Sequence, residues 1–360
     1  MLEENLSVMM VFDPRFPFED VKAICARLDA SQSLVPGFIP ALAGIMSVEA
    51  LLFAEQIDQT TTIILPDRNL VSRMARVARN GVLRPLDRPT QIAVDLMAVS
   101  QALNWDIEPS IAFHELAHQQ GDEIANEELR WFRAADHGQA NAWIDIAHGR
   151  ANGLGSIKLG QSTDFALAAP LHRWRRNYAI ALRVAALELS QRTPFERTTA
   201  LINWMVSDFI VAGPAALFAA MFLSPRASRA GMIKHLKSPD RARAVAGVQN
   251  AAWDITHLSD FVLRATSPSA AGKRFILGTA DQALAEIGRL LISNSEHLEA
   301  VEQKLAVDIE PWWASDAHAV AKLICGAVSV ARARPRPEAN GDHVGALISI
   351  GERLVVDCTP

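Results

Sequence analysis

The sequence predicts an α/β fold with a central, mostly parallel sheet, helices on both of its faces and a helical insertion. The first observation is the apolar run 61–65, which ends at Pro66 and is followed by Asp67 and a segment with helical spacing. The second is the run 275–279, followed in the same way by Asp281 and a helical segment. A strand, an acid and a helix form the unit of open α/β sheets, whose ligands bind beyond the carboxyl ends of the strands.

The composition indicates a large, ordered globular chain. Of 360 residues, 50% are hydrophobic and 21% are charged, and the net charge of −5 limits any nucleic-acid surface to a local patch. Cys25, Cys325 and Cys358 lie far apart without CxxC spacing, as expected of free thiols in a reducing cytoplasm. The start is acidic where a secretory signal is basic, and the apolar run 209–223 is too short for a span. We therefore expect a cytoplasmic protein with no membrane role.

Helical spacing accounts for most of the remaining chain. We expect a first strand at residues 6–12 and helices at 18–28 and 41–57. Residues 1–360 are interpreted as a single elaborated domain that carries a helical insertion at 140–245. Within residues 340–360, the segments 344–350 and 353–356 predict a C-terminal β-hairpin about Gly351 and Glu352.

Two further carboxylates are predicted to point inward. Asp254 falls on the apolar face of its helix, and Glu115 also follows apolar residues at helical spacing. A buried carboxylate is unfavourable unless it is paired or binds a cation. With Asp67 and Asp281, these acids form a hard-oxygen site suited to Mg²⁺ or Mn²⁺. Such sites activate water and hold both oxygens of a phosphodiester displacement.

In these residues the chain resembles the PIN-like nuclease domains. Residues 67–69 resemble the D-x-N opening of that family. Four acids occur in the family's order, each in the expected type of element: Asp67, Glu115, Asp254 and Asp281. The resemblance covers mainly residues 60–135 and 245–295. The spacings on both sides of the third acid are longer than in compact members, which places the helical insertion between the second acid and the third.

The resemblance implies a Rossmann-like three-layer α/β/α sandwich and a metal-dependent nuclease that hydrolyses phosphodiesters. RNA is favoured over DNA as the substrate, with single-stranded RNA as the expected partner. The four acids would hold the metal, and Glu115 would bind it or orient water. Asn69 and Thr279 would support these ligands through hydrogen bonds. An inhibitory partner protein and the oligomeric state are left open.

Two basic stretches are candidate contacts for nucleic-acid phosphates and bases. They contain Arg173, Trp174, Arg175, Arg226, Arg229, Lys234 and Lys237. For any single one of them, a solvated helix face is the alternative interpretation.

Two other functions fit parts of the sequence. His114, Glu115 and His118 match HExxH, in which both histidines bind Zn²⁺ and the glutamate is the general base of a metallopeptidase. The longer zinc motif is incomplete, because Ile124 stands where a third histidine is expected. The second alternative is a non-catalytic nucleic-acid-binding PIN-like protein, whose acids are helix caps and solvated surface.

Overall fold

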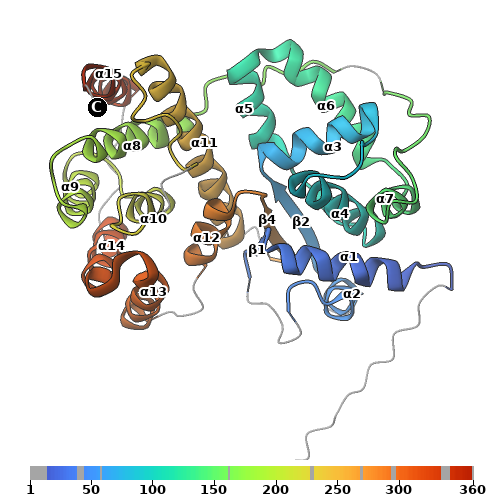
Figure 1. Cartoon of the computed structure of the whole chain (residues 1–360). Helices are drawn as coiled ribbons and strands as arrows, with labels where there is room; N and C mark the ends of the chain where they lie inside the picture. Colours follow the sequence, from blue (N-terminus) through green and yellow to red (C-terminus); the bar gives the residue numbers. More distant parts are fainter. Residues whose placement is uncertain are drawn as a thin grey trace, which may run out of the picture.

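The protein is dominated by helices, which corrects the fold class predicted from the sequence (Figure 1). The structure is a computed structural model that describes residues 14–38, 44–56, 59–160, 163–227, 231–267, 271–292, 297–333 and 341–358. Helices make up 67% of the described residues, which contain four strands in one small mixed sheet. The prediction of a Rossmann-like three-layer α/β/α sandwich is therefore wrong.

The sheet places two strand ends side by side. Its strands are β1 (Leu34–Pro36), β2 (Thr61–Pro66), β3 (Asp106–Ile107) and β4 (Lys273–Gly278). They follow the order β1-β4-β2-β3, in which β2 is parallel to both β3 and β4, and β1 is antiparallel to β4. In the register of the central pair, Pro66 lies opposite Gly278. The segments that follow β2 and β4 consequently leave the sheet at the same edge.

The N-terminal helices surround one face of the sheet. They are α1 (Phe18–Ser31), α2 (Val48–Gln56), α3 (Arg68–Asn80), α4 (Arg88–Ala102), α5 (Ser110–Gln120), α6 (Asp122–Asp136) and α7 (Ala140–Ala147). The helix predicted at 18–28 is confirmed by α1. Part of the helix predicted at 41–57 is present as α2, whereas the strand predicted at 6–12 lies outside the described residues.

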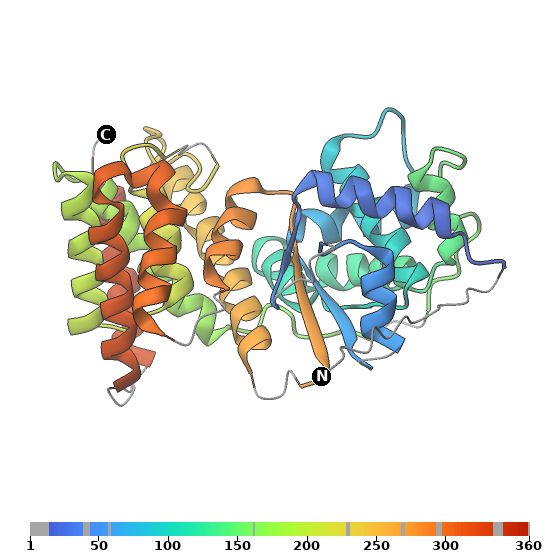
Figure 2. The same ribbon diagram turned by 90° about the horizontal axis from the view of Figure 1, so that it is seen from below.

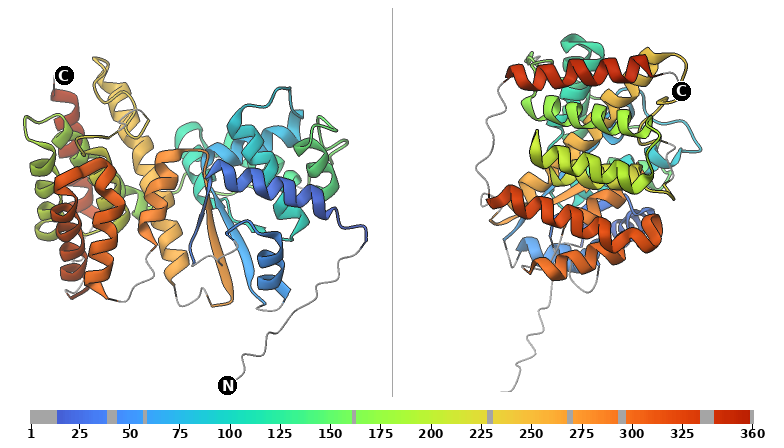
Figure 3. Two further views of the ribbon diagram at one scale, coloured as in Figure 1. Left: turned by 60° about the horizontal axis from the view of Figure 1, so that its bottom comes forward. Right: turned by 90° about the vertical axis from the view of Figure 1, so that its left-hand side faces the viewer.

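A second group of helices forms a body beside the sheet (Figure 2). It contains α8 (His172–Glu188), α9 (Pro194–Ser207), α10 (Gly213–Phe222), α13 (Leu298–Trp313), η2 (Ala314–Asp316), α14 (Ala317–Ala333) and α15 (Gly341–Asp357). Between this body and the strands lie α11 (Arg241–Thr266) and α12 (Gln282–Leu291) (Figure 3). The helical body is thus not confined to 140–245, because α13, α14 and α15 belong to it.

The strands separate two hydrophobic cores. Ile64 and Ile276 belong to the core with α1–α7, whereas Leu65 and Leu277 belong to the core with α8–α15. This division follows from the alternation of side chains along a strand. Both faces of the central strands are therefore covered, which explains why their sequences are nearly continuous apolar runs.

The predicted C-terminal hairpin is wrong, because residues 341–357 form α15. Gly351, expected in the turn, lies where α15 packs on α8. A Cβ at this position would stand 2.7 Å from Cβ of Leu182, so the glycine permits close approach of two helices.

One helical stretch among the described residues, Leu298–Ala333, is long and apolar enough to cross a membrane by length and composition. In the structure this stretch is divided into α13 and α14, which pack against each other on either side of η2. Each helix is shorter than the roughly 20 residues that a span needs. The stretch is therefore a helical hairpin in this fold.

Candidate functional site

Asp67 and Asp281 lie at the carboxyl ends of two neighbouring parallel strands. The backbone N–H of Asp67 donates to the carbonyl of Gly278 over 2.8 Å, which joins the two strand ends. Each aspartate also caps the next helix: Asp67 accepts from the N–H of Leu70 at 2.8 Å, and Asp281 from that of Leu284 at 3.2 Å. Capping and membership of a shared site are therefore compatible roles for both acids.

Thr279 connects these two acids. Its hydroxyl donates to Oδ2 of Asp67 over 2.6 Å and accepts from the backbone N–H of Asp281 at 3.0 Å. Thr279 is buried, so its supporting hydrogen bond is shielded from water. Asn69 does not share this role. It is exposed, and its side-chain oxygen accepts from Arg73 at 3.3 Å on the outer surface of α3. The predicted supporting contact from Asn69 is therefore wrong.

Glu115 reaches the same region from α5 and meets a histidine that sequence reasoning missed. Nε2 of His257 lies 3.3 Å from Oε2 of Glu115, and both side chains are buried. The other carboxylate oxygen accepts from Nε2 of Gln119 at 3.1 Å. His257 follows Asp254 by three residues on α11, so both face the same way. That spacing was the signal available in the sequence.

Asp254 is the least compensated acid of the site. It is half-buried, and among the described residues no hydrogen bond or ion pair reaches its carboxylate. Burial raises the pKa of Asp254 well above its ordinary value. The negative charges of Glu115, Asp281 and Asp67 raise it further, while Lys234 lowers it. The four predicted acids therefore share one electrostatic environment.

Asp67 is compensated in part. Burial raises the pKa of its carboxyl above the ordinary value, and hydrogen bonds from Thr279 and Leu70 oppose this rise. The charge of His257 lowers the pKa of Asp67 and that of Glu115 raises it. The hydrogen bonds favour the ionised form, which is the form that binds a cation.

The oxygen atoms of the four acids are ligands of the type that a hard divalent cation prefers, although they are farther apart than the ligands of a bound metal ion. Among the residues that the structure describes, no three His, Cys, Asp or Glu side chains stand close enough together to hold a metal ion. All four acids nevertheless offer oxygen ligands, and Asp254 has no other partner there. A carboxylate can accept about four hydrogen bonds or ligands, so the capping bonds leave lone pairs available.

The two histidines of the HExxH pattern have other contacts. Nδ1 of His114 lies 2.6 Å from the carbonyl oxygen of Leu167, and Nδ1 of His118 lies 2.8 Å from that of His114. The His118 ring also packs against Trp253 and Trp174, with centroids 5.2 and 5.8 Å away.

Three of the candidate nucleic-acid contacts interact with other side chains of the protein. Arg173 forms an ion pair of 2.7 Å with the buried Asp260, and Lys237 lies 3.9 Å from Glu188. Trp174 stacks on Tyr178, with ring centroids 5.0 Å apart.

Lys234 is the basic candidate placed beside the acids. Of the other basic candidates, Arg226 is exposed and the Arg175 guanidinium lies beside Gly345 of α15. Arg229 lies outside the described residues. Lys234 is exposed, and its charge acts on Asp254. Its position depends on Gly247 of α11, because a Cβ there would stand 1.8 Å from the carbonyl oxygen of Lys234. Only a glycine lets the 231–237 segment approach the helix this closely.

No family model, curated protein or solved structure matches the chain.

We expect Thr279→Val to destabilise the protein by about 1–3 kcal/mol at neutral pH, because it removes a hydroxyl that donates to a buried carboxylate. The free energy of unfolding in urea measures this effect. Thr266→Val is the matched control, since the exposed Thr266 hydroxyl bonds only the carbonyl of Val262 in its own helix. The control should stay within about 0.5 kcal/mol of the parent. If the two substitutions lowered the free energy of unfolding equally, the supporting role of Thr279 would be contradicted.

Proposed function

We propose that this protein is a divalent-metal-dependent nuclease that hydrolyses nucleic-acid phosphodiesters, with RNA favoured over DNA. The observation that carries the proposal is Asp254, a half-buried carboxylate without a partner in the described part of the chain. Three other acids raise its pKa. Four acids in one environment are unfavourable together, and a bound cation makes their joint ionisation favourable.

Each acid has a role that its contacts support. Asp67, Asp254 and Asp281 would hold Mg²⁺ or Mn²⁺, and Glu115 would hold the metal or orient the attacking water. His257 fixes the orientation of Glu115 from the opposite helix. A metal bound here would lower the pKa of its water and neutralise charge on the phosphate.

Substrate binding is assigned to the basic side chain beside the acids. Lys234 is exposed and its charge lowers the pKa of Asp254, which supports a role in which its ammonium group would contact a phosphate next to the scissile bond. Arg173 is left out of this role because it is ion-paired with Asp260. We propose single-stranded RNA as the substrate class and the cytoplasm as the location.

The likeness to PIN-like nucleases is proposed for the site and not for the fold. It rests on the order of the four acids and on their positions at strand ends and on inward helix faces. The helix-dominated architecture is a separate finding.

Asp281→Asn separates this function from its alternatives. Asparagine caps helices as well as aspartate does, so the bond from Leu284 and the fold should be retained while one charge is lost. We expect Mn²⁺-dependent cleavage of a fluorescent single-stranded RNA to fall by about 100-fold or more. Asp87→Asn is the matched control, because Asp87 caps α4 in the same way outside the site, and it should cleave like the parent.

The histidines provide the opposing test. His114→Ala combined with His118→Ala should leave cleavage largely intact, since neither ring contacts the four acids through a hydrogen bond. Loss of activity in this double variant alone, with tightly bound zinc in the parent, would contradict the nuclease and favour the metallopeptidase. RNA binding without metal binding or cleavage would favour the non-catalytic alternative.

A further inference from the structure

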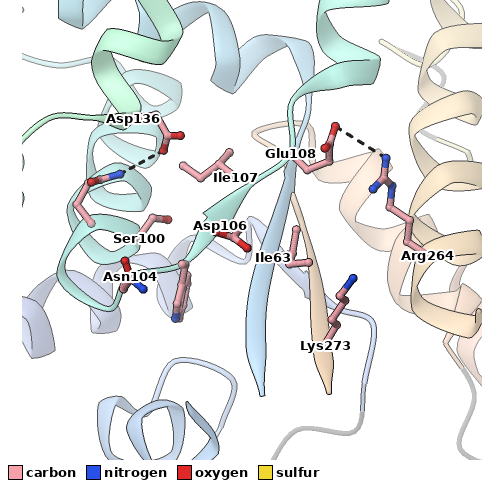
Figure 4. A pocket seen from close by; sticks show the side chains of 11 residues that line it. Ile63, Ser100, Asn104, Asp106, Ile107, Glu108, Asp136, Arg264 and Lys273 are labelled. Carbon is pink, nitrogen blue, oxygen red and sulfur yellow. Dashed lines mark hydrogen bonds and ion pairs between the residues drawn. The ribbon is translucent and has the colours of Figure 1, made fainter. Parts of the chain in front are cut away.

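A cavity of about 510 Å³ opens over the β3 edge of the sheet, away from the four acids (Figure 4). It lies beside Ile63 in the first half of β2, whereas Asp67 follows the end of that strand. Its size is in the range of sites for small organic ligands, roughly 300–1,000 Å³, and far exceeds the needs of a single ion.

One side of the cavity is acidic. Asp106 is exposed there and has no hydrogen-bond or ion-pair partner among the described residues. Asp136 is half-buried and accepts from Nε2 of Gln101 at 3.2 Å. Burial raises the pKa of Asp136, the neighbouring His137 and Gln101 lower it, and the charge of Asp106 raises it again. The C-terminal ends of α4 and α6 also lie here, and their dipoles add negative potential.

Two neutral polar groups on this side lack partners. The Ser100 hydroxyl is completely buried, and no hydrogen bond reaches it from the described residues. Because a buried polar group is normally hydrogen-bonded, this lining hydroxyl is available to accept a hydrogen bond from the cavity side. Asn104 next to it has a left-handed backbone with φ of 50°, and among the described residues no hydrogen bond engages its amide. Both groups lie on the same side as Asp136 in Figure 4.

The opposite wall carries the two basic groups of the lining together with Glu108. Arg264 is engaged in ion pairs with Asp260 at 2.6 Å and Glu108 at 3.8 Å. Lys273 is exposed, and no ion pair reaches it within the described ranges. Figure 4 shows Lys273 on the far side of the cavity from Asp136, with Asp106 between them. The cavity therefore separates a site for a positive group from a site for a negative group.

We propose that this cavity binds a small zwitterion of the basic amino-acid class. Its ammonium or guanidinium group lies between Asp106 and Asp136 and donates to the Ser100 hydroxyl, and its carboxylate pairs with Lys273. Three acids and two bases line the cavity, which disfavours a simple anion, and the volume favours an organic ligand over a metal ion. The inference is independent of the nuclease function, because the two sites share no residue.

Titration calorimetry of the full chain with L-arginine, L-lysine and agmatine tests this ligand class, up to about 10 mM ligand. We expect saturable one-to-one binding of at least one of the two amino acids. Asp106→Asn and Asp136→Asn should each weaken it about tenfold or more, because each removes one charge from the cation site. Asp136→Asn keeps the bond from Gln101 and removes a half-buried charge, so it should fold.

Lys273→Ala tests the carboxylate end. It should weaken binding of L-arginine but leave agmatine, which has a guanidinium and no carboxylate, unchanged. Glu123→Gln is the matched control: it removes an exposed charge at the other end of α6 and should bind like the parent. Three outcomes would overturn the proposal: no binding of either amino acid, binding unaffected by both aspartate substitutions, or equal effects of Lys273→Ala on L-arginine and agmatine.

Discussion

Asp254→Asn is expected to abolish Mn²⁺-dependent cleavage and, without metal, to stabilise the protein by about 1–3 kcal/mol at pH 8. The two effects have one cause. The carboxylate has no hydrogen-bond or ion-pair partner in the described chain, and burial and the charges of three other acids raise its pKa, so its ionised form is unfavourable in the folded state. Asparagine has nearly the same shape but no charge. It therefore removes the unfavourable ionised group and, with it, the negative charge that a bound cation requires.

The same substitution changes the dependence of stability on pH. An aspartate in the unfolded chain titrates near 3.9, whereas the folded protein raises the pKa of Asp254. The folded state therefore binds more protons than the unfolded state between these two values. The metal-free parent protein should lose stability as the pH rises through this interval. The Asp254→Asn variant should not show the contribution of Asp254 to this loss.

Urea unfolding from pH 4 to pH 8 in the presence of a chelator measures this difference. Asp29→Asn is the control, because Asp29 is an exposed acid on α1 whose removal changes the net charge equally. The gain from Asp254→Asn should grow with pH and the gain from Asp29→Asn should stay near zero. Lower stability of Asp254→Asn at pH 8, or full cleavage activity, would contradict the role assigned to this residue.

Gly247→Ala is expected to destabilise the protein by about 1–3 kcal/mol and to raise KM for RNA more than it lowers kcat. The added Cβ would stand 1.8 Å from the carbonyl oxygen and 2.8 Å from the carbonyl carbon of Lys234. Both are backbone atoms, so the whole 231–237 segment must move. This movement would displace Lys234 relative to Asp254 without changing the positions of the four acids.

Gly326→Ala provides a matched control in another helix. Gly326 lies within α14, and a Cβ there would meet no atom within 4 Å. Replacing an unobstructed helical glycine by alanine should stabilise the protein by about 0.5–1 kcal/mol. A similar gain for Gly247→Ala, with unchanged KM, would show that the close approach to Lys234 does not position the substrate contact.

The central part of the fold was predictable because it depends on local signals. The apolar runs of β2 and β4 end in Pro66 and Gly278, and each is followed by an aspartate that caps a helix. The edges were not predictable in this way. β1 has three residues and β3 has two, too few for periodicity to appear, so the small size of the sheet was missed.

The error in α15 has a different physical origin. Its valines and isoleucines favour strands, and Gly351 resembles a turn residue when only neighbours in sequence are considered. The glycine is required by the approach of Leu182 from α8, which is a contact between residues far apart in the chain. Tertiary packing overrode local propensity at this helix.

The candidate site shows the same division. Each of its four acids was recognisable from a strand end or an apolar helix face. The contact between His257 and Glu115 was not recognisable from the sequence, because it joins two distant helices, α11 and α5. Its only signal was that His257 lies one helical turn from Asp254. Asn69 was assigned from the D-x-N pattern that it forms with Asp67, yet α3 directs it to the surface.

Titration calorimetry of Mn²⁺ binding to the metal-free protein tests most directly whether the four acids form one cation site. The parent should bind Mn²⁺, and Mg²⁺ should compete for the same site. Four single variants, Asp67→Asn, Glu115→Gln, Asp254→Asn and Asp281→Asn, should each weaken this binding, whereas Asp87→Asn should not. Absence of binding to the parent, or equal binding by the four variants and the Asp87→Asn control, would contradict the proposed metal centre.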